Sequence, residues 1–193
     1  MQARIFAFRE RSIVWSLVLS VALFAARDAR AAERRPQGSG FVVRGAAGIG
    51  VGAMDVSDQS GSQTGFAGGA TLGLAGRRFE LDFEIAAQPF RVDNPVGLES
   101  FRVVYFLPSL RIHGPHAYLR VGIGWARYSW SGPEAFVSND SGPAVSAAVG
   151  YELARPRAIP VAIEAYFRRG TSDFEFESRL AGVQLVASWS ARK

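Results

Sequence analysis

The sequence predicts an all-β chain that folds as an eight-stranded antiparallel up-and-down β-barrel. After residue 40, large hydrophobic residues recur at every second position, which is the period of a β-strand whose two faces differ in chemistry. Eight segments show this alternation, and none shows the period of a helix. Long and short connections alternate between the segments, as they do in an up-and-down barrel whose two termini share the short-turn end.

The first three segments show the alternation most clearly. Residues 41–54 place hydrophobic residues at odd positions, opposite Arg44 and a row of small residues. Residues 65–75 place them at even positions, again opposite small residues. In residues 79–85 every odd position is a large hydrophobic residue and every even position is an acid, so only a strand separates the two kinds.

The other five segments follow the same rule. Residues 101–112 are the least regular, because Val103 and Leu107 put hydrophobic side chains on the otherwise polar face. The remaining four have large hydrophobic residues at odd positions and small, polar or charged residues at even ones; they are residues 117–130, 144–153, 161–168 and 182–189.

The connections differ in length at the two ends of the predicted barrel. Four are long and rich in Gly, Ser, Asp, Asn or Pro, which are turn and loop formers: residues 55–63, 92–99, 131–141 and 170–177. Three are tight turns, at residues 76–78, 113–116 and 155–157. We therefore expect four long loops at one end and three short turns at the other.

The N-terminal segment has the pattern of a secretory signal peptide. Basic residues precede an apolar run from Ile13 to Ala26, and Ala29-Arg30-Ala31 offers a small-x-small cleavage site. The apolar run is shorter than the roughly 20 residues that a helix needs to span a bilayer. We expect a cleaved signal peptide at residues 1–31, a flexible leader at 32–40, the barrel at 41–190 and a short tail at 191–193.

The composition excludes several classes of function. The chain has no cysteine and only two histidines, so disulfides, thiolate nucleophiles and cysteine-ligated metals are absent. Without residues 1–31 it carries 17 basic and 15 acidic residues, and its arginines are scattered along the chain. A nucleic-acid-binding surface requires clustered positive charge, so we expect no nucleic-acid partner.

The two faces of the predicted strands favour a wall that meets lipid. The apolar face carries the bulky side chains, while the other face mixes Gly, Ala and Ser with charged residues, which suits the narrow lumen of a small barrel. Aromatic residues also collect near both ends of the strands, as in the girdles of membrane barrels. We expect the following charged residues to pair inside the lumen: Arg44, Glu80, Asp82, Glu84, Arg111, Arg120, Glu152, Glu164 and Arg168.

On these features, residues 41–190 resemble a small bacterial outer-membrane β-barrel of the OmpA, OmpX and opacity-protein type. The stretch from Gly182 through Leu185 to Trp189 is similar to the C-terminal assembly signal of that family, which has a glycine, alternating apolar residues and a final aromatic residue. It differs in that four residues follow Trp189. The resemblance implies a bacterial outer-membrane location, contact with outer-membrane lipid and lipopolysaccharide, insertion by the barrel assembly machinery, and a monomer.

No residues in the sequence form a convincing catalytic, metal or cofactor site. His113 and His116 are the only candidate imidazole bases, and both fall in a predicted short turn with no Asp, Glu or Cys beside them. Glu80, Asp82 and Glu84 share one strand face and could be read as a cation or acid–base cluster. Pairing with arginines from other strands explains them better, because isolated buried charges are costly.

We therefore expect a structural or surface-interaction role in the outer membrane, with extracellular loops that contact envelope or host components and with no enzymatic activity. The alternative is a narrow channel for small or hydrophobic molecules that resembles the OmpW type and would need an apolar lumen pocket. Two further alternatives rank lower: a lipid-modifying enzyme, which the two histidines do not support, and a soluble exported barrel.

Overall fold

The computed structural model describes residues 40–56, 59–76, 78–94, 97–114, 116–131, 137–153, 160–172 and 176–192. The predicted signal peptide and residues 32–39 of the predicted leader lie outside these ranges. In the described part of the chain the regular structure is all β, and no helix there is long and apolar enough to cross a membrane.

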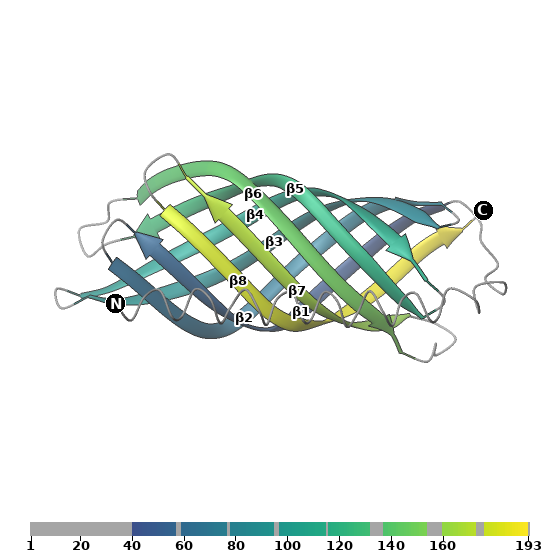
Figure 1. Cartoon of the computed structure of the whole chain (residues 1–193), viewed down its shortest axis with the longest axis horizontal. Coiled ribbons are helices and arrows are strands. Elements are labelled where there is room, and N and C mark those ends of the chain that lie inside the picture. The colour runs from purple at the N-terminus through teal and green to yellow at the C-terminus, as the bar shows by residue number, and fades with distance from the viewer. Residues whose placement is uncertain are drawn as a thin grey trace, which may run out of the picture.

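The eight strands form one closed antiparallel barrel, which confirms the predicted fold class (Figure 1). Each strand pairs with its neighbours in sequence, and β1 closes the barrel against β8 over their whole lengths. β8 runs two residues into the segment expected as a tail. The strands are β1 (Gly40–Val56), β2 (Gln59–Ala75), β3 (Phe79–Asn94), β4 (Gly97–His113), β5 (Ala117–Ser131), β6 (Val137–Glu152), β7 (Val161–Thr171) and β8 (Phe176–Arg192).

We define the two ends of the barrel by their connections. The turn end holds the start of β1, the end of β8 and the connections β2–β3, β4–β5 and β6–β7. The loop end holds the connections β1–β2, β3–β4, β5–β6 and β7–β8. Both ends of the paired chain therefore lie at the turn end, as the sequence predicts.

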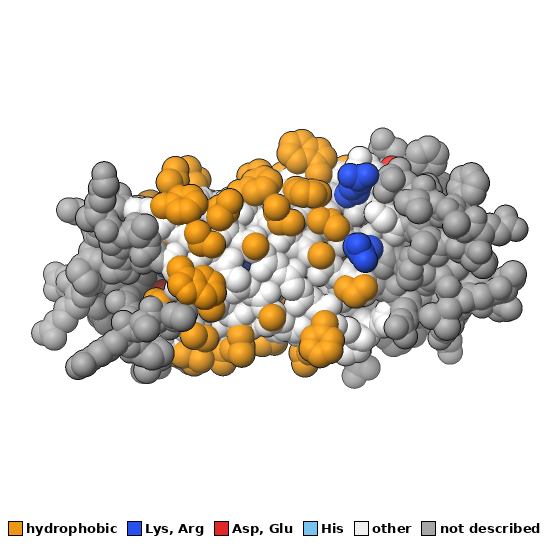
Figure 2. Space-filling view, turned by 180° about the vertical axis from the view of Figure 1, so that it is seen from behind, with side chains coloured by type: hydrophobic (Ala, Val, Ile, Leu, Met, Phe, Trp, Pro, Cys, Tyr) orange, Lys and Arg blue, Asp and Glu red, His pale blue; other side chains and the backbone are white. Residues whose placement is uncertain are grey.

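Side chains alternate between the outer wall and the lumen as the sequence pattern predicts. In β3, Phe83 is 42% exposed whereas its neighbour Glu84 is 2% exposed. In β4, Val103 and Leu107 are fully buried. They are odd-numbered residues, so they face the lumen together with the polar residues at the other odd positions of this strand. On the face that Figure 2 shows, hydrophobic side chains are distributed over the outer wall between its two ends, with backbone and other side chains among them.

Glycines in the wall make room for large lumen side chains. A Cβ atom at Gly150 of β6 would overlap the ring of Tyr118, which lies on the neighbouring β5. A Cβ atom at Gly50 would overlap the hydroxyl of Tyr166 in the same way. The lumen of an eight-stranded barrel is only wide enough for its own side chains. The glycines on the inward face therefore leave the space that the rings of the neighbouring tyrosines occupy.

The predicted long loops are wrong, because the strands continue through most of those segments. Only residues 57–58 separate β1 from β2, and only residues 95–96 separate β3 from β4. The polar residues 59–63, for example, pair with β1 up to Val56. Strand pairing through backbone hydrogen bonds needs no apolar side chain, so alternation of hydrophobic residues underestimates strand length. At the turn end one connection is longer than the sequence predicts. Eight residues, 153–160, separate β6 from β7, where a tight turn was expected.

Two strand pairings stop short of the loop end. The β2–β3 ladder ends at Gly68 and Ala87, although both strands continue beyond it. The β6–β7 ladder ends at Ala144 and Gly170. Pro89 and Pro143 lie just beyond these points and lack an N–H group to donate to a ladder, as is typical of residues at a sheet edge.

The packing of Tyr118 against Gly150 can be tested by adding one methyl group. We expect Gly150→Ala to lower the free energy of unfolding by about 1–3 kcal/mol, because overpacking forces neighbours to shift. Urea unfolding in detergent would measure this effect. The control is Gly45→Ala, whose Cβ would lie 3.7 Å from Trp189, an ordinary contact. Equal stability of both variants would contradict the tight fit.

Candidate functional site

The barrel lumen holds the charged residues that the sequence analysis singled out. Six strands supply them: β1, β3, β4, β5, β6 and β7. Glu152 lies half-buried at the turn-end mouth. The other eight are at most 5% exposed: Arg44, Glu80, Asp82, Glu84, Arg111, Arg120, Glu164 and Arg168.

A first cluster lies toward the turn end. Arg44 makes a two-pronged ion pair with Glu80, with 2.6 Å between Nη2 and Oε2, and also reaches Asp82 at 3.1 Å. Arg111 contacts the other oxygen of Asp82 at 3.1 Å. The Nε2 atom of His113 lies 3.0 Å from Glu80. Each of the two carboxylates therefore contacts two nitrogen-bearing side chains.

A second cluster fills the middle of the barrel. Arg120 pairs with both Glu84 and Glu164, the latter at 2.7 Å. Arg168 pairs with Glu84 at 2.6 Å. Glu164 also accepts a hydrogen bond of 2.6 Å from the amide of Gln184. The side chains of this cluster connect four strands across the lumen: β3, β5, β7 and β8.

Tyr118 connects the two clusters. The guanidinium of Arg111 lies 4.2 Å from the centre of its ring, which is a cation–π distance. Its hydroxyl donates a hydrogen bond of 2.9 Å to Glu164 in the second cluster. At the far side of that cluster, Arg168 stacks over Tyr166 at 4.1 Å. An ion-pair ladder therefore runs from His113 to Tyr166.

The ladder is charge-balanced. Four arginines and four carboxylates are buried in it, so no net charge remains among these eight side chains. A buried charge without a partner would cost several kcal/mol. Because each charge has partners on other strands, the ladder specifies which strands can lie opposite one another across the lumen.

The loop-end half of the lumen is packed with tyrosines and aliphatic side chains. The hydroxyl groups of Tyr105 and Tyr128 meet at Ser178, at 2.8 and 3.0 Å. Ser178 is fully buried. Apolar side chains fill the space around this junction: Met54, Ala67, Ala86, Val103, Leu107, Ala126, Ala144, Ala148 and Leu180.

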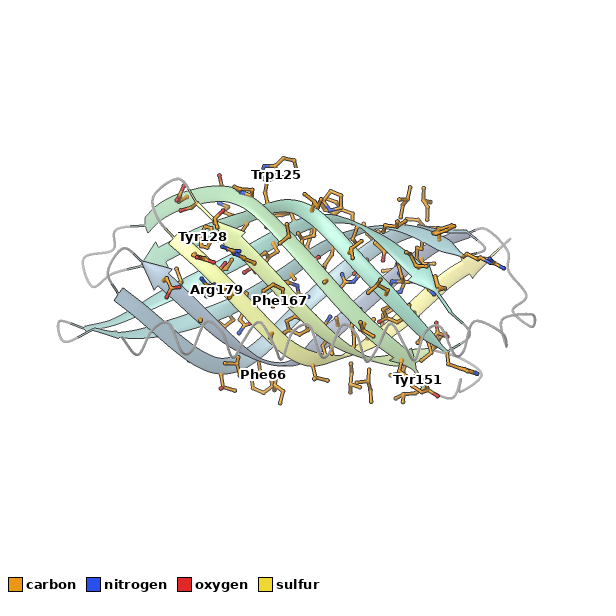
Figure 3. The ribbon with its side chains drawn as sticks, in the orientation of Figure 1. Phe66, Trp125, Tyr128, Tyr151, Phe167 and Arg179 are labelled. Atoms are coloured by element: carbon orange, nitrogen blue, oxygen red, sulfur yellow. The ribbon has the colours of Figure 1, made fainter. Side chains whose placement is uncertain are left out.

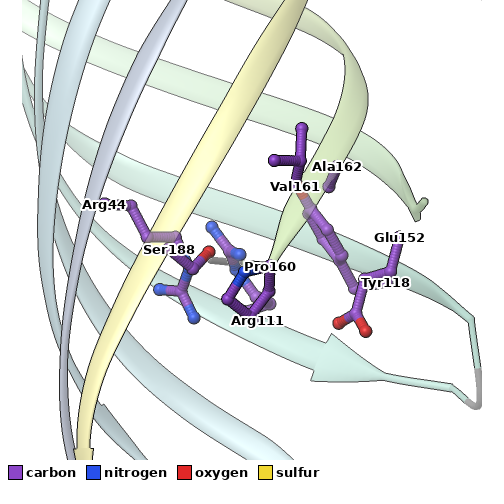
Figure 4. Close-up of a pocket in the computed structure, with 8 residues that line it drawn as sticks. All are labelled: Arg44, Arg111, Tyr118, Glu152, Pro160, Val161, Ala162 and Ser188. Carbon is purple, nitrogen blue, oxygen red and sulfur yellow. The ribbon is translucent and has the colours of Figure 1, made fainter. Parts of the chain in front are cut away.

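A small cavity opens at the turn-end mouth (Figure 4). It has a volume of about 30 Å³ and is lined by Arg44, Arg111, Tyr118, Glu152, Pro160, Val161, Ala162 and Ser188. A water molecule needs about 10–15 Å³ on this measure. The cavity therefore has room for a few waters.

The two histidines have different environments. The sequence analysis placed both in a turn, but His113 is the last residue of β4 and joins the ladder through Glu80. Ser109, Arg111 and His113 are alternate residues of β4, so their side chains lie on the same, inward face of the strand. This alternation is the sequence signal that could have placed His113 in the lumen. His116 is exposed, and its ring lies 6.3 Å from that of Tyr151.

The sequence does not predict that the lumen tyrosines and Gln184 contact the buried charges. The alternation of side chains places these residues on the inward face, but it does not show which charged residue each of them contacts.

The residues of the predicted assembly signal lie on β8. Leu185 and Trp189 point outward and are exposed, and Trp189 lies opposite Val43 of β1. Gly182 sits against Tyr166, where a Cβ atom would come within 2.6 Å of the tyrosine hydroxyl. These three residues therefore lie at the seam where the last strand closes the barrel against the first.

The chemistry of the lumen is that of structural ion pairing. The described side chains include no group of three or more His, Cys, Asp or Glu residues placed to hold a metal ion. The ring nitrogens of His113 lie beside carboxylates, at 3.0 Å from Glu80 and 3.9 Å from Glu152.

Comparison with known proteins identifies the fold. No protein-family model matches the chain, and no curated protein sequence does. Among solved structures, it is similar to Neisserial surface protein A, with a TM-score of 0.59 and 14% identity, over 78% of this chain and 96% of that one. It is also similar to Ail, the attachment invasion locus protein of Yersinia pestis, solved with the heparin analogue sucrose octasulfate; the TM-score is 0.52 and the identity 10%, over 78% of this chain and 99% of that one. The predicted resemblance to small outer-membrane barrels is confirmed at the level of the fold.

The ladder predicts a large cost for removing one of its acids. Glu164 is fully buried and is contacted by Arg120, Tyr118 and Gln184. We expect Glu164→Leu to lower the free energy of unfolding by about 3–5 kcal/mol, because Arg120 then shares a single remaining acid. Urea unfolding in detergent would measure the loss.

The matched control is Glu177→Leu on the outer wall. Glu177 pairs with Arg169 and Arg179 at 2.7 Å, but these partners are well exposed, so we expect a cost of about 0–1 kcal/mol. Similar small losses for both variants would show that the lumen charges do not depend on one another.

Proposed function

We propose that this chain is an integral β-barrel of the bacterial outer membrane with a structural or surface-interaction role. One observation carries the proposal: a closed barrel turns its apolar side chains outward and its charges inward. A soluble barrel would have the reverse arrangement. The fold shared with other small barrels and the signal-peptide pattern of residues 1–31 support the same location.

The outer wall is apolar on every strand. Among the side chains that the structure describes, twenty-three large hydrophobic ones are at least 37% exposed, and they include Ile123 at 75% and Phe66 at 80%. Trp125, Phe66 and Tyr151 point away from the wall (Figure 3). Soluble monomers rarely expose contiguous apolar surface of this extent, whereas lipid would cover it.

The lumen supports a structural role. The ion-pair ladder occupies its turn-end and middle parts, and the tyrosine junction at Ser178 closes the loop-end part. We propose that the barrel acts as a monomeric scaffold whose loop end contacts envelope or host components, and that β8 serves the barrel assembly machinery as the insertion signal. The two similar proteins, Neisserial surface protein A and the attachment invasion locus protein Ail, are in line with a surface role.

Single-cysteine labelling tests the location and orientation. The chain has no cysteine, so each variant carries one reactive site. With a membrane-impermeant maleimide, we expect Thr64→Cys at the loop end to react in intact cells and Arg78→Cys at the turn end to react only after the outer membrane is permeabilised. Ile123→Cys should stay unlabelled in both cases because lipid covers it. Labelling of Ile123→Cys in intact protein would contradict a lipid-facing wall.

The alternative function is a narrow channel for small or hydrophobic molecules. It is favoured only by the apolar composition of the loop-end lumen, which side chains fill. We expect the purified protein in planar bilayers to show no stable porin-sized conductance, because the ladder and the tyrosine junction occupy the part of the lumen that the structure describes. Reproducible conductance steps that disappear in a lumen variant such as Arg120→Trp would establish a channel instead.

A further inference from the structure

The cavity at the turn-end mouth borders a buried guanidinium that is short of partners. We call this space, lined by the eight residues given above, the turn-end cavity. Arg111 lines it and is 3% exposed. In the part of the chain that the structure describes, its only carboxylate contact is Asp82, which its Nε atom approaches to 3.1 Å without making a hydrogen bond. The terminal nitrogens of Arg111 therefore have no carboxylate partner among the described side chains.

The other three arginines of the ladder are better satisfied. Each binds a carboxylate through a terminal nitrogen at 2.6 to 2.7 Å; the pairs are Arg44 with Glu80, Arg120 with Glu164, and Arg168 with Glu84. A guanidinium carries five N–H donors, and buried donors without an acceptor are costly. Arg111 thus needs a further acceptor, and the turn-end cavity is the space that can hold one.

The size of the turn-end cavity matches a carboxylate group. Its volume is about 30 Å³, and one water takes about 10–15 Å³ on this measure, so about two oxygen-sized positions fit. A carboxylate presents two oxygens side by side, and it pairs with a guanidinium through two parallel N–H···O bonds. The ring of Tyr118 covers one face of the Arg111 guanidinium at 4.2 Å, so a ligand meets Arg111 at its edge, where the N–H groups point.

The charges around the mouth favour an anion that arrives from the turn end. Glu152 is the only acid among the lining residues, and in Figure 4 its carboxylate lies across the cavity from the guanidinium groups of Arg44 and Arg111. The connections at this end contain four arginines and no acid; they are residues 76–78, 114–116 and 153–160. Their positive charge attracts anions to the mouth and offsets the negative charge that a ligand adds to the balanced ladder.

We propose that the turn-end cavity binds a carboxylate group, which the terminal nitrogens of Arg111 hold at their edge. The carboxylate belongs either to a small free acid or to Glu33, the one acid in the expected leader 32–39, seven residues before Gly40. Both sources supply the same chemistry at the same atoms. The site does not depend on which compartment the turn end faces, so its test is independent of the proposed function.

The experiment measures formate binding to the mature protein in detergent by saturation-transfer NMR. Formate is the probe because it is a carboxylate without further bulk, and formamide is a neutral molecule of similar size. We expect formate to bind saturably, acetate to compete with it and formamide not to compete. A water-filled cavity without a preference for carboxylates would show no such difference between formate and formamide.

Two variants test whether Arg111 holds the ligand. Arg111→Lys keeps a cation near Asp82 but loses the planar pair of donors, so we expect formate binding to weaken at least about tenfold. Glu152→Gln removes a like charge from the cavity lining, so we expect binding to tighten about threefold.

Two further variants serve as blocker and control. Ser188→Leu places a larger apolar side chain in the lining and keeps every charge, so we expect it to abolish formate binding. Arg78→Gln removes an exposed arginine at the same end that does not line the cavity, so binding should stay within about twofold of the wild type. The heat-modifiable band on gels verifies that each variant folds. If Arg111→Lys does not fold, Ser188→Leu and Glu152→Gln decide the matter.

The outcomes separate the two sources of the carboxylate from failure of the proposal. If the wild type binds no formate but Glu33→Gln binds it saturably, the site is supported and Glu33 occupies it. If neither protein binds formate, or if formamide competes as well as acetate does, the proposal is wrong. An equal loss of binding in Arg78→Gln and Arg111→Lys would also overturn it, because the general positive charge of the turn end would then explain the binding.

Discussion

The structure depends on the mutual neutralisation of eight charges inside a space that is barely wide enough for them. Arg120 illustrates the constraint, because it is among the largest fully buried side chains and reaches acids on two different strands, Glu84 on β3 and Glu164 on β7. Each carboxylate has a further partner, Arg168 for Glu84 and Tyr118 for Glu164, but Arg120 is the one cation that both share. The strands of the barrel are therefore held in position from inside by electrostatics as well as around the wall by backbone pairing.

This constraint accounts for other features of the wall. Tyr118 joins the two charge clusters, and its ring fits only because Gly150 lies behind it. The buried charges lie on the inward face of the strands, and most of the large hydrophobic residues lie on the outward face. The ladder fills the turn-end and middle lumen, and the remaining loop-end space is closed by the tyrosines at Ser178. One internal arrangement thus produces both a solid interior and an apolar exterior, which is the combination that a scaffold in a membrane needs.

The sequence predicted the strand number, the order of the strands and the facing of their side chains, because a period of two is visible in any one strand without knowledge of the others. It did not predict strand length at the loop end, since polar segments such as residues 59–63 pair through the backbone alone. It also missed His113, which was assigned to a turn by its neighbours Gly114 and Pro115. The specific partners of each charge depend on the stagger of strands across the closed barrel, and no local pattern records that stagger.

The central claim is that the lumen charges stabilise the barrel only as sets of partners. A double-mutant cycle on Arg168 and Glu84, which lie 2.6 Å apart, tests it most directly. The free energies of unfolding of Glu84→Leu, Arg168→Met and the double variant would be measured in the same detergent. We expect the double variant to be more stable than the sum of the two single losses implies, with a coupling of at least about 1 kcal/mol. Losses that add within about 0.5 kcal/mol would contradict it, because they would show that each charge is buried independently of its partner.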